Sequence, residues 1–263
     1  MLPNDPEFPL LEDAELAALP SDDLRAYLEA LQEWQRRLER RKLWRYYPET
    51  GPLRRELYAK HMEFFRAGAR HRERLFIAAN RVGKTEGGGG IETTYHLTGH
   101  YPDWWEGKRF FHPIDAWAGG KTNEMTRDIL QACLFGGVDY NGGVRRLKGT
   151  GLVPGDDIGE TRFRRGGDLA DTIKIRHHTG GVFDGWSTLG FKSYEQGRGA
   201  FEGTAKHLIW LDEEPELAVY TECLIRTMTT EGHMILTFTP LEGLSDVVLS
   251  FLPGGEIPEQ EAA

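Results

Sequence analysis

Two short segments of the sequence carry residue types suited to nucleotide chemistry. The first is Ala78-Ala79-Asn80-Arg81-Val82-Gly83-Lys84-Thr85, which follows an apolar run and matches the phosphate-loop pattern except at Ala78, where the pattern has glycine. Successive backbone N–H groups in such a loop form a concave nest for phosphate oxygens. In this arrangement Lys84 reaches the β- and γ-phosphates as a point charge, and Thr85 offers its hydroxyl to Mg²⁺.

A second Gly-Lys-Thr occurs at Gly120-Lys121-Thr122, so the tripeptide alone does not locate a phosphate site. Loop length separates the two copies, because the nest needs about five residues between the strand and the lysine. Residues 78–83 supply them, whereas only 118–120 separate the second lysine from its apolar run. Four glycines, 87–90, follow the first copy, and each destabilises a helix by about 1 kcal/mol. Close packing of this helix on a sheet would explain their presence. We predict that the first copy binds phosphate and the second is a strand–turn–helix without a ligand.

The second segment is Leu208-Ile209-Trp210-Leu211-Asp212-Glu213-Glu214-Pro215, an apolar run that ends in adjacent acids. A strand of this kind places the acids at the carboxyl edge of the sheet, where ligands of open α/β folds bind. Asp212 would hold Mg²⁺ through its water shell, and Glu213 would polarise the attacking water. The alternative is a strand that ends in a solvated acidic turn, and the phosphate loop upstream favours the catalytic interpretation.

Three further positions each have two interpretations. Thr237 and Thr239 end the next apolar run before Pro240 and would share one face of a strand, where their hydroxyls sense the γ-phosphate or serve only as β-branched strand residues. Arg198 lies between glycines, and is either an arginine finger for a neighbouring subunit or a solvated surface residue. Arg81, inside the phosphate loop, is a rival for the same role in cis.

The histidines show no comparable pattern. His177 and His178 are consecutive in an expected strand, so they face opposite sides and cannot chelate one ion together. His96 and His100 have the i, i+4 spacing of a helix, but no third ligand is evident. We therefore expect no metal other than Mg²⁺.

The arrangement of apolar runs predicts an α/β fold of the P-loop NTPase type, with a mostly parallel central sheet covered by helices. Strands are expected at 75–78, 114–118, 172–176, 186–194, 207–211 and 234–238, and a helix capped by Thr122 over 122–134. Residues 136–167 show no clear period. A helix over 21–46, capped by Ser21-Asp22-Asp23, forms an N-terminal arm. The expected divisions are an arm at 1–51, an ATPase domain at 52–250 and a polar tail at 251–263.

Composition narrows the class of protein further. The net charge is −9, from 32 basic and 41 acidic residues, which disfavours a protein that coats nucleic acid by bulk positive charge. A basic stretch over 36–45 either contacts DNA phosphates or is a solvated helix face. No apolar run approaches the roughly 18 residues of a membrane span. Cys133 and Cys223 lie far apart and form no disulfide framework.

With these segments together, the chain resembles the large terminase subunit of tailed bacteriophages, in its N-terminal ATPase half, over about residues 55–250. The resemblance rests on the three segments above and on two more, Phe191-Lys192-Ser193-Tyr194-Glu195-Gln196-Gly197-Arg198 with Phe201-Glu202-Gly203-Thr204, and Tyr101-Pro102-Asp103-Trp104-Trp105-Glu106-Gly107. It implies a motor subunit that self-associates into a ring and hydrolyses ATP with Mg²⁺ to translocate double-stranded DNA into a procapsid. The implied partners are the portal protein and the small terminase subunit. The implied location is the host cytoplasm, transiently at the procapsid portal.

The resemblance also implies roles for single residues. Lys84 and Thr85 match the nucleotide-binding loop, Asp212 the Mg²⁺-associated acid and Glu213 the catalytic glutamate. Residues 237–240 match the segment that couples hydrolysis to movement, and Arg198 lies where some members place an arginine finger. Phe64 and Phe65 are candidates for the adenine contact.

Family members normally continue into a ribonuclease-H-like nuclease domain, and 23 residues after Pro240 are too few for one. We therefore expect no nuclease activity from these 263 residues. Two alternatives stay open, namely another P-loop ATPase acting on nucleic acid, of the helicase-like kind, and a non-catalytic packaging scaffold with a vestigial nucleotide site.

Overall fold

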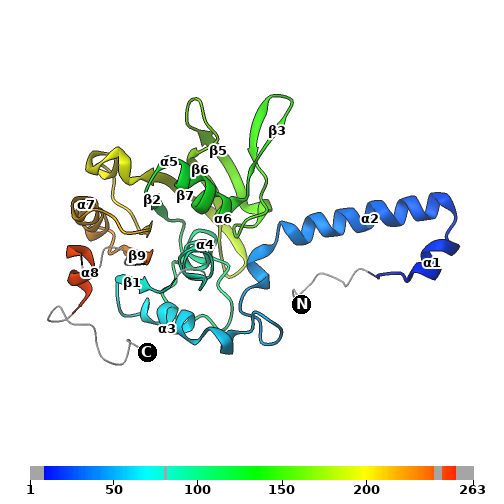
Figure 1. Ribbon diagram of the computed structural model, residues 1–263, viewed down its shortest axis with the longest axis horizontal. Coiled ribbons are helices and arrows are strands. Elements are labelled where there is room, and N and C mark those ends of the chain that lie inside the picture. The colour runs from blue at the N-terminus through cyan, green and yellow to red at the C-terminus, as the bar shows by residue number, and fades with distance from the viewer. Residues whose placement is uncertain (1–8, 80–81, 240–244, 253–263) are drawn as a thin grey trace.

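A seven-stranded sheet forms the centre of the computed structural model (Figure 1), which describes residues 9–79, 82–239 and 245–252. Its strand order is β1-β9-β8-β2-β7-β6-β5. The strands are β1 (Glu73–Ile77), β2 (Asp115–Gly120), β5 (Ile158–Phe163), β6 (Ala170–Thr179), β7 (Val182–Ser193), β8 (Leu208–Asp212) and β9 (His233–Phe238). From β1 to β7 in this order every neighbouring pair is parallel, whereas the β7–β6 and β6–β5 pairs are antiparallel. The expected α/β fold with a mostly parallel sheet is therefore confirmed.

Successive side chains of the central strands point to opposite faces of the sheet, so the interior contains two hydrophobic cores, one on each face. In β8, Leu208 and Trp210 join one core, while Ile209 and Leu211 join the other. All five residues of β8 are buried. Both faces must therefore be covered by other elements, which explains why β8 reads as a continuous apolar run.

Helices cover the two faces. The first core is covered by α3 (Ala59–Ala67), α4 (Ile91–Thr98) and α6 (Ala132–Phe135), and the second by α7 (Leu217–Met228) and α8 (Asp246–Phe251). A π-helical segment, η3 (Lys84–Gly90), leads directly into α4. The helix expected over 122–134 is confirmed as α5 (Asn123–Met125), the π-helical η4 (Thr126–Gln131) and α6. Thr122 caps it, because its side chain accepts a hydrogen bond from the backbone N–H of Met125.

The four glycines of η3 let this helix lie against the sheet more closely than any side chain would allow. A Cβ atom at Gly89 would lie 2.3 Å from Nε1 of Trp210 on β8, and one at Gly88 would lie 2.8 Å from the ring of Phe76 on β1. At Gly87 it would lie 2.7 Å from the hydroxyl of Tyr47. Close packing on the sheet at Gly88 and Gly89 therefore explains why glycines occur in this helix.

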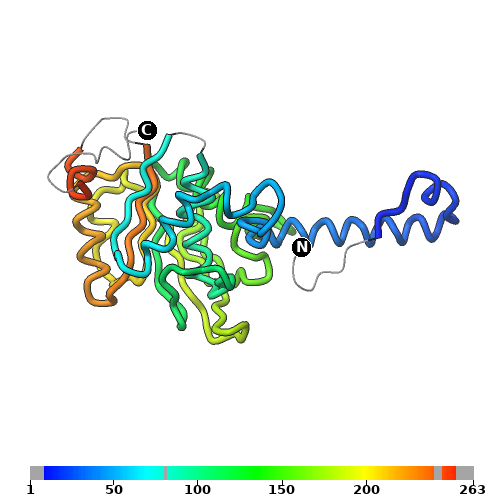
Figure 2. Tube along the Cα trace, turned by 90° about the horizontal axis from the view of Figure 1, so that it is seen from below, coloured from blue at the N-terminus to red at the C-terminus, as the bar shows by residue number. Residues whose placement is uncertain are grey.

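The N-terminal arm projects from the main domain (Figure 2) and contains α1 (Asp13–Ala18) and α2 (Ser21–Glu39), which bury no residue. The expected helix over 21–46 is too long, because α2 ends at Glu39 and a 3₁₀ turn, η1 (Lys42–Arg45), follows. Beyond that end, Leu43 and Tyr47 turn inward and join the first core. The expected cap is wrong as well, since Pro20 is the N-cap and no side chain caps the helix.

Residues 136–167 contain three strands where the sequence showed no period. A hairpin of β3 (Val138–Asn141) and β4 (Val144–Leu147) forms a separate two-stranded sheet, and β5 forms the edge of the main one. Gly142 and Gly143 both have positive φ, of 58° and 80°, as a two-residue hairpin turn requires. The residues of β3 and β4 are exposed or half-buried, so no core selects an apolar alternation in the sequence. Among the described helices, none is long and apolar enough to cross a membrane.

The glycine packing predicts the effect of one methyl group. Gly89→Ala adds about 1 kcal/mol of helix propensity, yet overpacking against Trp210 costs about 1–3 kcal/mol and displaces the Trp210 indole. Because a Cβ at Gly89 would lie 2.3 Å from Nε1 of Trp210, the overpacking cost is near the upper end of that range. The net loss is then about 2 kcal/mol, and the melting temperature should fall by about 4–8 °C. Gly167→Ala is the control, because a Cβ there meets nothing within 4 Å. Thermal denaturation followed by circular dichroism decides, and an unchanged or raised melting temperature for Gly89→Ala would contradict the packing.

Candidate active site

The segment predicted to bind phosphate leaves β1 at Ile77 and enters η3 at Lys84. Gly83 has a φ of +82°, a left-handed conformation that favours glycine, and its carbonyl accepts hydrogen bonds from the N–H groups of Gly87 and Gly88. These bonds start the helix immediately after the loop, where backbone N–H groups and the helix dipole attract anions. The side chain of Lys84 is buried, whereas Val82 is exposed. Ala79 ends the first described stretch, and Asn80 and Arg81 lie outside the described residues.

A hydrogen-bonded cluster around Asp212 joins this helix to the sheet. The hydroxyl of Thr85 donates to Oδ1 of Asp212 at 2.9 Å, and the hydroxyl of Thr237 donates to the same oxygen at 2.6 Å. Nε1 of Trp210 donates to the Thr237 hydroxyl at 2.8 Å. The structure therefore brings together three predicted site residues from η3, β8 and β9.

The carboxylate of Asp212 lies in a poorly hydrated place. Burial raises its pKa to about 6, although the hydrogen bonds from Thr237 and Thr85 act in the opposite direction. A buried carboxylate needs a compensating positive charge, which a divalent cation provides. Asp212 Oδ1 accepts a hydrogen bond from the Thr85 hydroxyl at 2.9 Å, so a Mg²⁺ ion bound by that hydroxyl would be held by Asp212 through its water shell.

Glu213 adopts a backbone conformation that is uncommon for its residue type. Its φ is +64°, in the left-handed region, and its N–H donates to the carbonyl of Thr237 at 3.0 Å. Strained backbone of this kind costs about 1–3 kcal/mol and concentrates at functional sites. The acid predicted to orient water is therefore held at the end of β8 by a specific tertiary contact.

Two neighbours brace the cluster. The hydroxyl of Tyr194 lies 2.8 Å from the carbonyl oxygen of Asp212, 3.1 Å from that of Glu213 and 3.2 Å from that of Gly119. Thr239 donates to the carbonyl of Ala78 at 2.9 Å, so the segment after β9 contacts the start of the phosphate loop. Tyr194 belongs to a segment that the sequence singled out, but only tertiary structure reveals its contact with the acids.

The root of the arm holds the other side of η3. Lys42 and Tyr46 both contact the carboxylate of Glu86, and the Tyr47 hydroxyl donates to the carbonyl of Gly87 at 2.7 Å. Tyr47 also lies 2.6 Å from Nδ1 of His61. Burial lowers the pKa of His61, and the backbone of Val82 acts in the opposite direction. Sequence reasoning missed these contacts, because the arm root and the helix are 40 residues apart.

Arg198 does not reach the Asp212 cluster of its own chain within the described residues. It begins the 3₁₀ turn η7 (Arg198–Phe201), and its side chain is 60% exposed. Its Nε lies 3.0 Å from Glu222 on α7 and 3.5 Å from Glu202. The exposed position is compatible with a role toward a second subunit, and that role stays a prediction.

The adenine candidates are wrong. Phe64 stacks on Phe76 with ring centroids 5.0 Å apart, and Phe65 packs on Trp105 at 4.9 Å. Their exposed fractions are 8% and 2%, and both belong to the first hydrophobic core. Both rings are packed in the core, and Phe65 also lines the cavity described next, which is apart from the Asp212 cluster.

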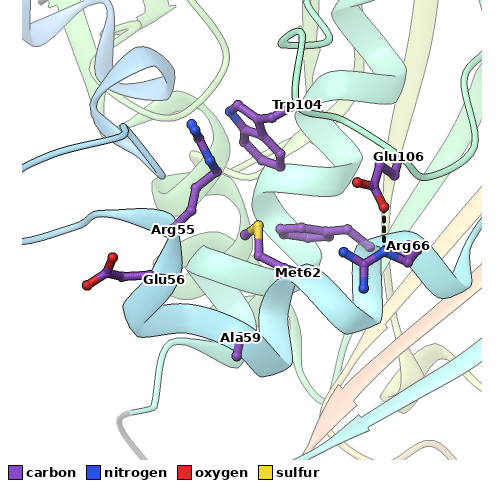
Figure 3. Close-up of a pocket in the computed structure, with 8 residues that line it drawn as sticks. Arg55, Glu56, Ala59, Met62, Arg66, Trp104 and Glu106 are labelled. Atoms are coloured by element: carbon purple, nitrogen blue, oxygen red, sulfur yellow. Dashed lines mark hydrogen bonds and ion pairs between the residues drawn. The ribbon is translucent and has the colours of Figure 1, made fainter.

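A cavity of about 270 Å³ lies beside this core (Figure 3). Its lining residues are Arg55, Glu56, Ala59, Met62, Phe65, Arg66, Trp104 and Glu106. Arg66 pairs with Glu106 across one side of it, and the Arg55 guanidinium lies 5.5 Å from the Trp104 ring. The cavity shares no residue with the Asp212 cluster, so it is separate from the candidate catalytic site.

The second Gly-Lys-Thr forms the expected strand–turn–helix. β2 extends through Gly120, and Thr122 already caps the next helix. No loop separates strand from helix, so no nest of N–H groups surrounds Lys121, which is exposed. This lysine provides a matched control for Lys84.

The raised pKa of Asp212 predicts a pH-dependent stability. The carboxyl of Asp212 is harder to ionise in the folded chain than in the unfolded chain, so its ionisation destabilises the fold. This loss of stability is absent at a pH below the ordinary pKa of 3.8, grows as the pH rises to about 6 and is complete above that pH. Asp212→Asn keeps an oxygen for Thr85 and Thr237 but removes the charge. Without nucleotide or Mg²⁺, we expect this variant to exceed the wild type in stability by on the order of 2–3 kcal/mol at pH 7.5.

The difference should shrink as the pH falls from 6 toward 4, and denaturant unfolding at several pH values measures it. Glu160→Gln, which removes an exposed acid, is the control and should show no such trend. A variant less stable than the wild type at pH 7.5 would show that Asp212 is not destabilised by its burial.

Comparison with known proteins identifies relatives of this chain. The family model of the N-terminal part of the terminase large subunit, T4-like virus type, matches residues 75–262. The large terminase subunit of Salmonella phage P22 is 40% identical over 211 residues, which cover 74% of this chain and 41% of the phage protein. The chain thus spans less than half the length of that relative.

Two solved structures of the large terminase from a thermophilic bacteriophage are also similar. They have TM-scores of 0.46 and 0.40, sequence identities of 11% and 12%, and the second was determined in complex with ADP. Each match covers 68% of this chain, and 37% and 38% of the respective thermophilic phage chains. Because the family model matches well over half of its residues, this chain belongs to the family of phage terminase large subunits.

Proposed function

We propose that this chain is the ATPase part of a viral DNA-packaging motor, which hydrolyses ATP with Mg²⁺ to translocate double-stranded DNA into a procapsid. The observation that carries the proposal is the buried Asp212 carboxylate, hydrogen-bonded by Thr85 from the helix after the phosphate loop and followed directly by Glu213. Membership of the terminase family supports DNA as the polymer that is moved.

In the proposed reaction, water attacks the γ-phosphate in line. Lys84 offsets charge on the β- and γ-phosphates, and Glu213 orients the water. Thr85 and Asp212 would hold Mg²⁺, which supplies positive charge to the phosphate oxygens when bound. Thr237 keeps the Asp212 carboxylate in place by a 2.6 Å hydrogen bond.

Coupling of hydrolysis to movement would use β9. Thr237 contacts Asp212 and Thr239 contacts Ala78, so one short segment touches both the metal-binding acid and the phosphate loop. A displacement of either contact by the departing phosphate would be transmitted to the chain that follows β9. In this account Thr237 senses the metal site and Thr239 the loop.

A ring of subunits would complete each site. Arg198 is exposed and held by Glu222 away from its own Asp212 cluster, which suits an arginine supplied to a neighbour. The net charge of −9 predicts weak DNA affinity for one chain, and ring assembly would raise it through multivalency. The portal protein and the small terminase subunit are the further partners in this proposal.

The proposed roles of Lys84 and Glu213 predict different effects of their substitution on ATP binding and turnover. Lys84→Ala should abolish both tight ATP binding and turnover, whereas Glu213→Gln should bind ATP but lower kcat by roughly 100-fold or more. Lys121→Ala alters the other Gly-Lys-Thr and should keep wild-type turnover. Phosphate release measures turnover, and titration with a fluorescent ATP analogue measures binding. Hydrolysis near the wild-type rate in Lys84→Ala and Glu213→Gln would refute the assignment.

The proposed arginine finger predicts complementation between subunits. Arg198→Ala and Lys84→Ala should each be inactive alone, yet a mixture should regain part of the activity, because a Lys84→Ala subunit can supply its arginine to an intact phosphate loop. A mixture of Lys84→Ala and Glu213→Gln is the control and should stay inactive, since every site lacks one of these residues. Full activity of Arg198→Ala alone would instead favour Arg81 acting in cis.

A further inference from the structure

A second cluster of chemically active side chains lies apart from the nucleotide site. His100 follows α4, Asp157 ends the 3₁₀ turn η5 (Gly155–Asp157), and His178 lies near the end of β6. One nitrogen or carboxylate oxygen from each residue lies within 4.8 Å of the others. His178 on β6 pairs with Phe183, near the beginning of β7, and β7 runs parallel to β2. The Asp212 cluster lies at the other end of the parallel strands, where β8 ends. The two sites are therefore at opposite edges of the sheet.

The hydrogen bond of His178 leaves a lone pair facing a carboxylate. Its Nδ1 lies 3.4 Å from the carbonyl oxygen of Thr98, which can only accept, so Nδ1 carries the hydrogen. In a neutral imidazole Nε2 is then unprotonated, and it lies 3.9 Å from Oδ1 of Asp157. A lone pair opposite a carboxylate oxygen is unfavourable unless a cation lies between them. A backbone carbonyl that fixes the far ring nitrogen is also the usual support of a metal-binding histidine.

The distances in the cluster suit a tetrahedral ion. Ligand atoms about 2.0–2.1 Å from Zn²⁺ lie about 3.3 Å from one another. Nε2 of His100 lies 2.8 Å from Oδ2 of Asp157, and Nε2 of His178 lies 3.9 Å from Oδ1, so each imidazole faces a different oxygen of the same carboxylate. The two imidazole rings stack with centroids 4.6 Å apart and face the same carboxylate. The three candidate ligand atoms lie within 4.8 Å of one another, so they would approach by up to about 1.5 Å to reach the spacing of a tetrahedral site.

We propose that His100, Asp157 and His178 form a Zn²⁺-binding site, with water as a fourth ligand. Two imidazole nitrogens and one carboxylate oxygen favour Zn²⁺ over Mg²⁺, which prefers oxygen ligands. The side chains of His100, Asp157 and His178 are 23%, 9% and 15% exposed, so an ion and a water molecule can enter. His177, the neighbour in sequence, takes no part, because it bonds Asp184 at 2.7 Å.

The position of the site gives it a structural role at the root of the arm. Arg40, at the end of α2, lies 3.3 Å from Asp156, and its carbonyl accepts from the N–H of Gly155 at 3.1 Å. The Trp44 ring lies 5.5 Å from that of His100. The turn η5 contacts the arm, and a bound ion would link this turn to the end of α4 and to β6.

Zn²⁺ alone is the probe for this site. Calorimetric titration of the untagged 263-residue chain, without nucleotide and with excess Mg²⁺ to fill oxygen-ligand sites, should show one equivalent of Zn²⁺ bound. His178→Ala and Asp157→Asn should each weaken binding at least tenfold, and His71→Ala, which removes an exposed histidine elsewhere, should leave it unchanged. Co²⁺ should give the visible absorption of a tetrahedral site in the wild type and in His71→Ala, but not in His178→Ala or Asp157→Asn.

Asp157→Asn keeps the shape of the side chain, so it tests the proposal even where His178→Ala does not fold. One equivalent of Zn²⁺ should raise the melting temperature of the wild type and leave that of Asp157→Asn unchanged. Absence of Zn²⁺ binding, or equal affinity in the wild type and Asp157→Asn, would overturn the proposal.

Discussion

The carboxylate of Asp212 accepts hydrogen bonds from two hydroxyls, one on the helix that follows the phosphate loop and one on the neighbouring strand. Through Thr237 this link continues to the indole of Trp210, against which Gly89 packs. The same short chain of contacts thus sets the height of the helix above the sheet and the place of the acid at its edge. Burial raises the pKa of Asp212, so the fold holds this charge at a cost in stability that a bound cation would relieve. Features that destabilise the folded state in this way are common at functional sites.

The helix after the phosphate loop is held from both sides. On the sheet side, four glycines bring its backbone close to Trp210 and Phe76. On the other side, the arm root contacts Glu86 and Gly87 through Lys42, Tyr46 and Tyr47. The first turns of this helix are π-helical. The arm root is therefore in direct contact with the candidate nucleotide site, although the outer helices of the arm bury no residue.

Much of this site could be predicted from sequence, because its chemistry is carried by local patterns. The apolar run before Asp212 predicted a strand buried on both faces, and β8 is that strand. Loop length distinguished the two Gly-Lys-Thr copies without any structure. Patterns failed where long-range packing decides: Phe64 and Phe65 resemble exposed ligand contacts only until the core is known. The hairpin of β3 and β4 carries no apolar alternation. His100, Asp157 and His178 come from three separate segments that the fold brings together, so no spacing rule connects them.

The proposed function requires a Mg²⁺-dependent ATPase site that neighbouring subunits complete. The most direct test is ATP hydrolysis by the unaltered chain over a series of subunit concentrations, with Mg²⁺ or with a chelator, and with or without duplex DNA. We expect no turnover without Mg²⁺, and a rate per subunit that rises with concentration or with DNA. A rate that is unaffected by the chelator, or no hydrolysis at any concentration despite ATP binding, would contradict the proposed function.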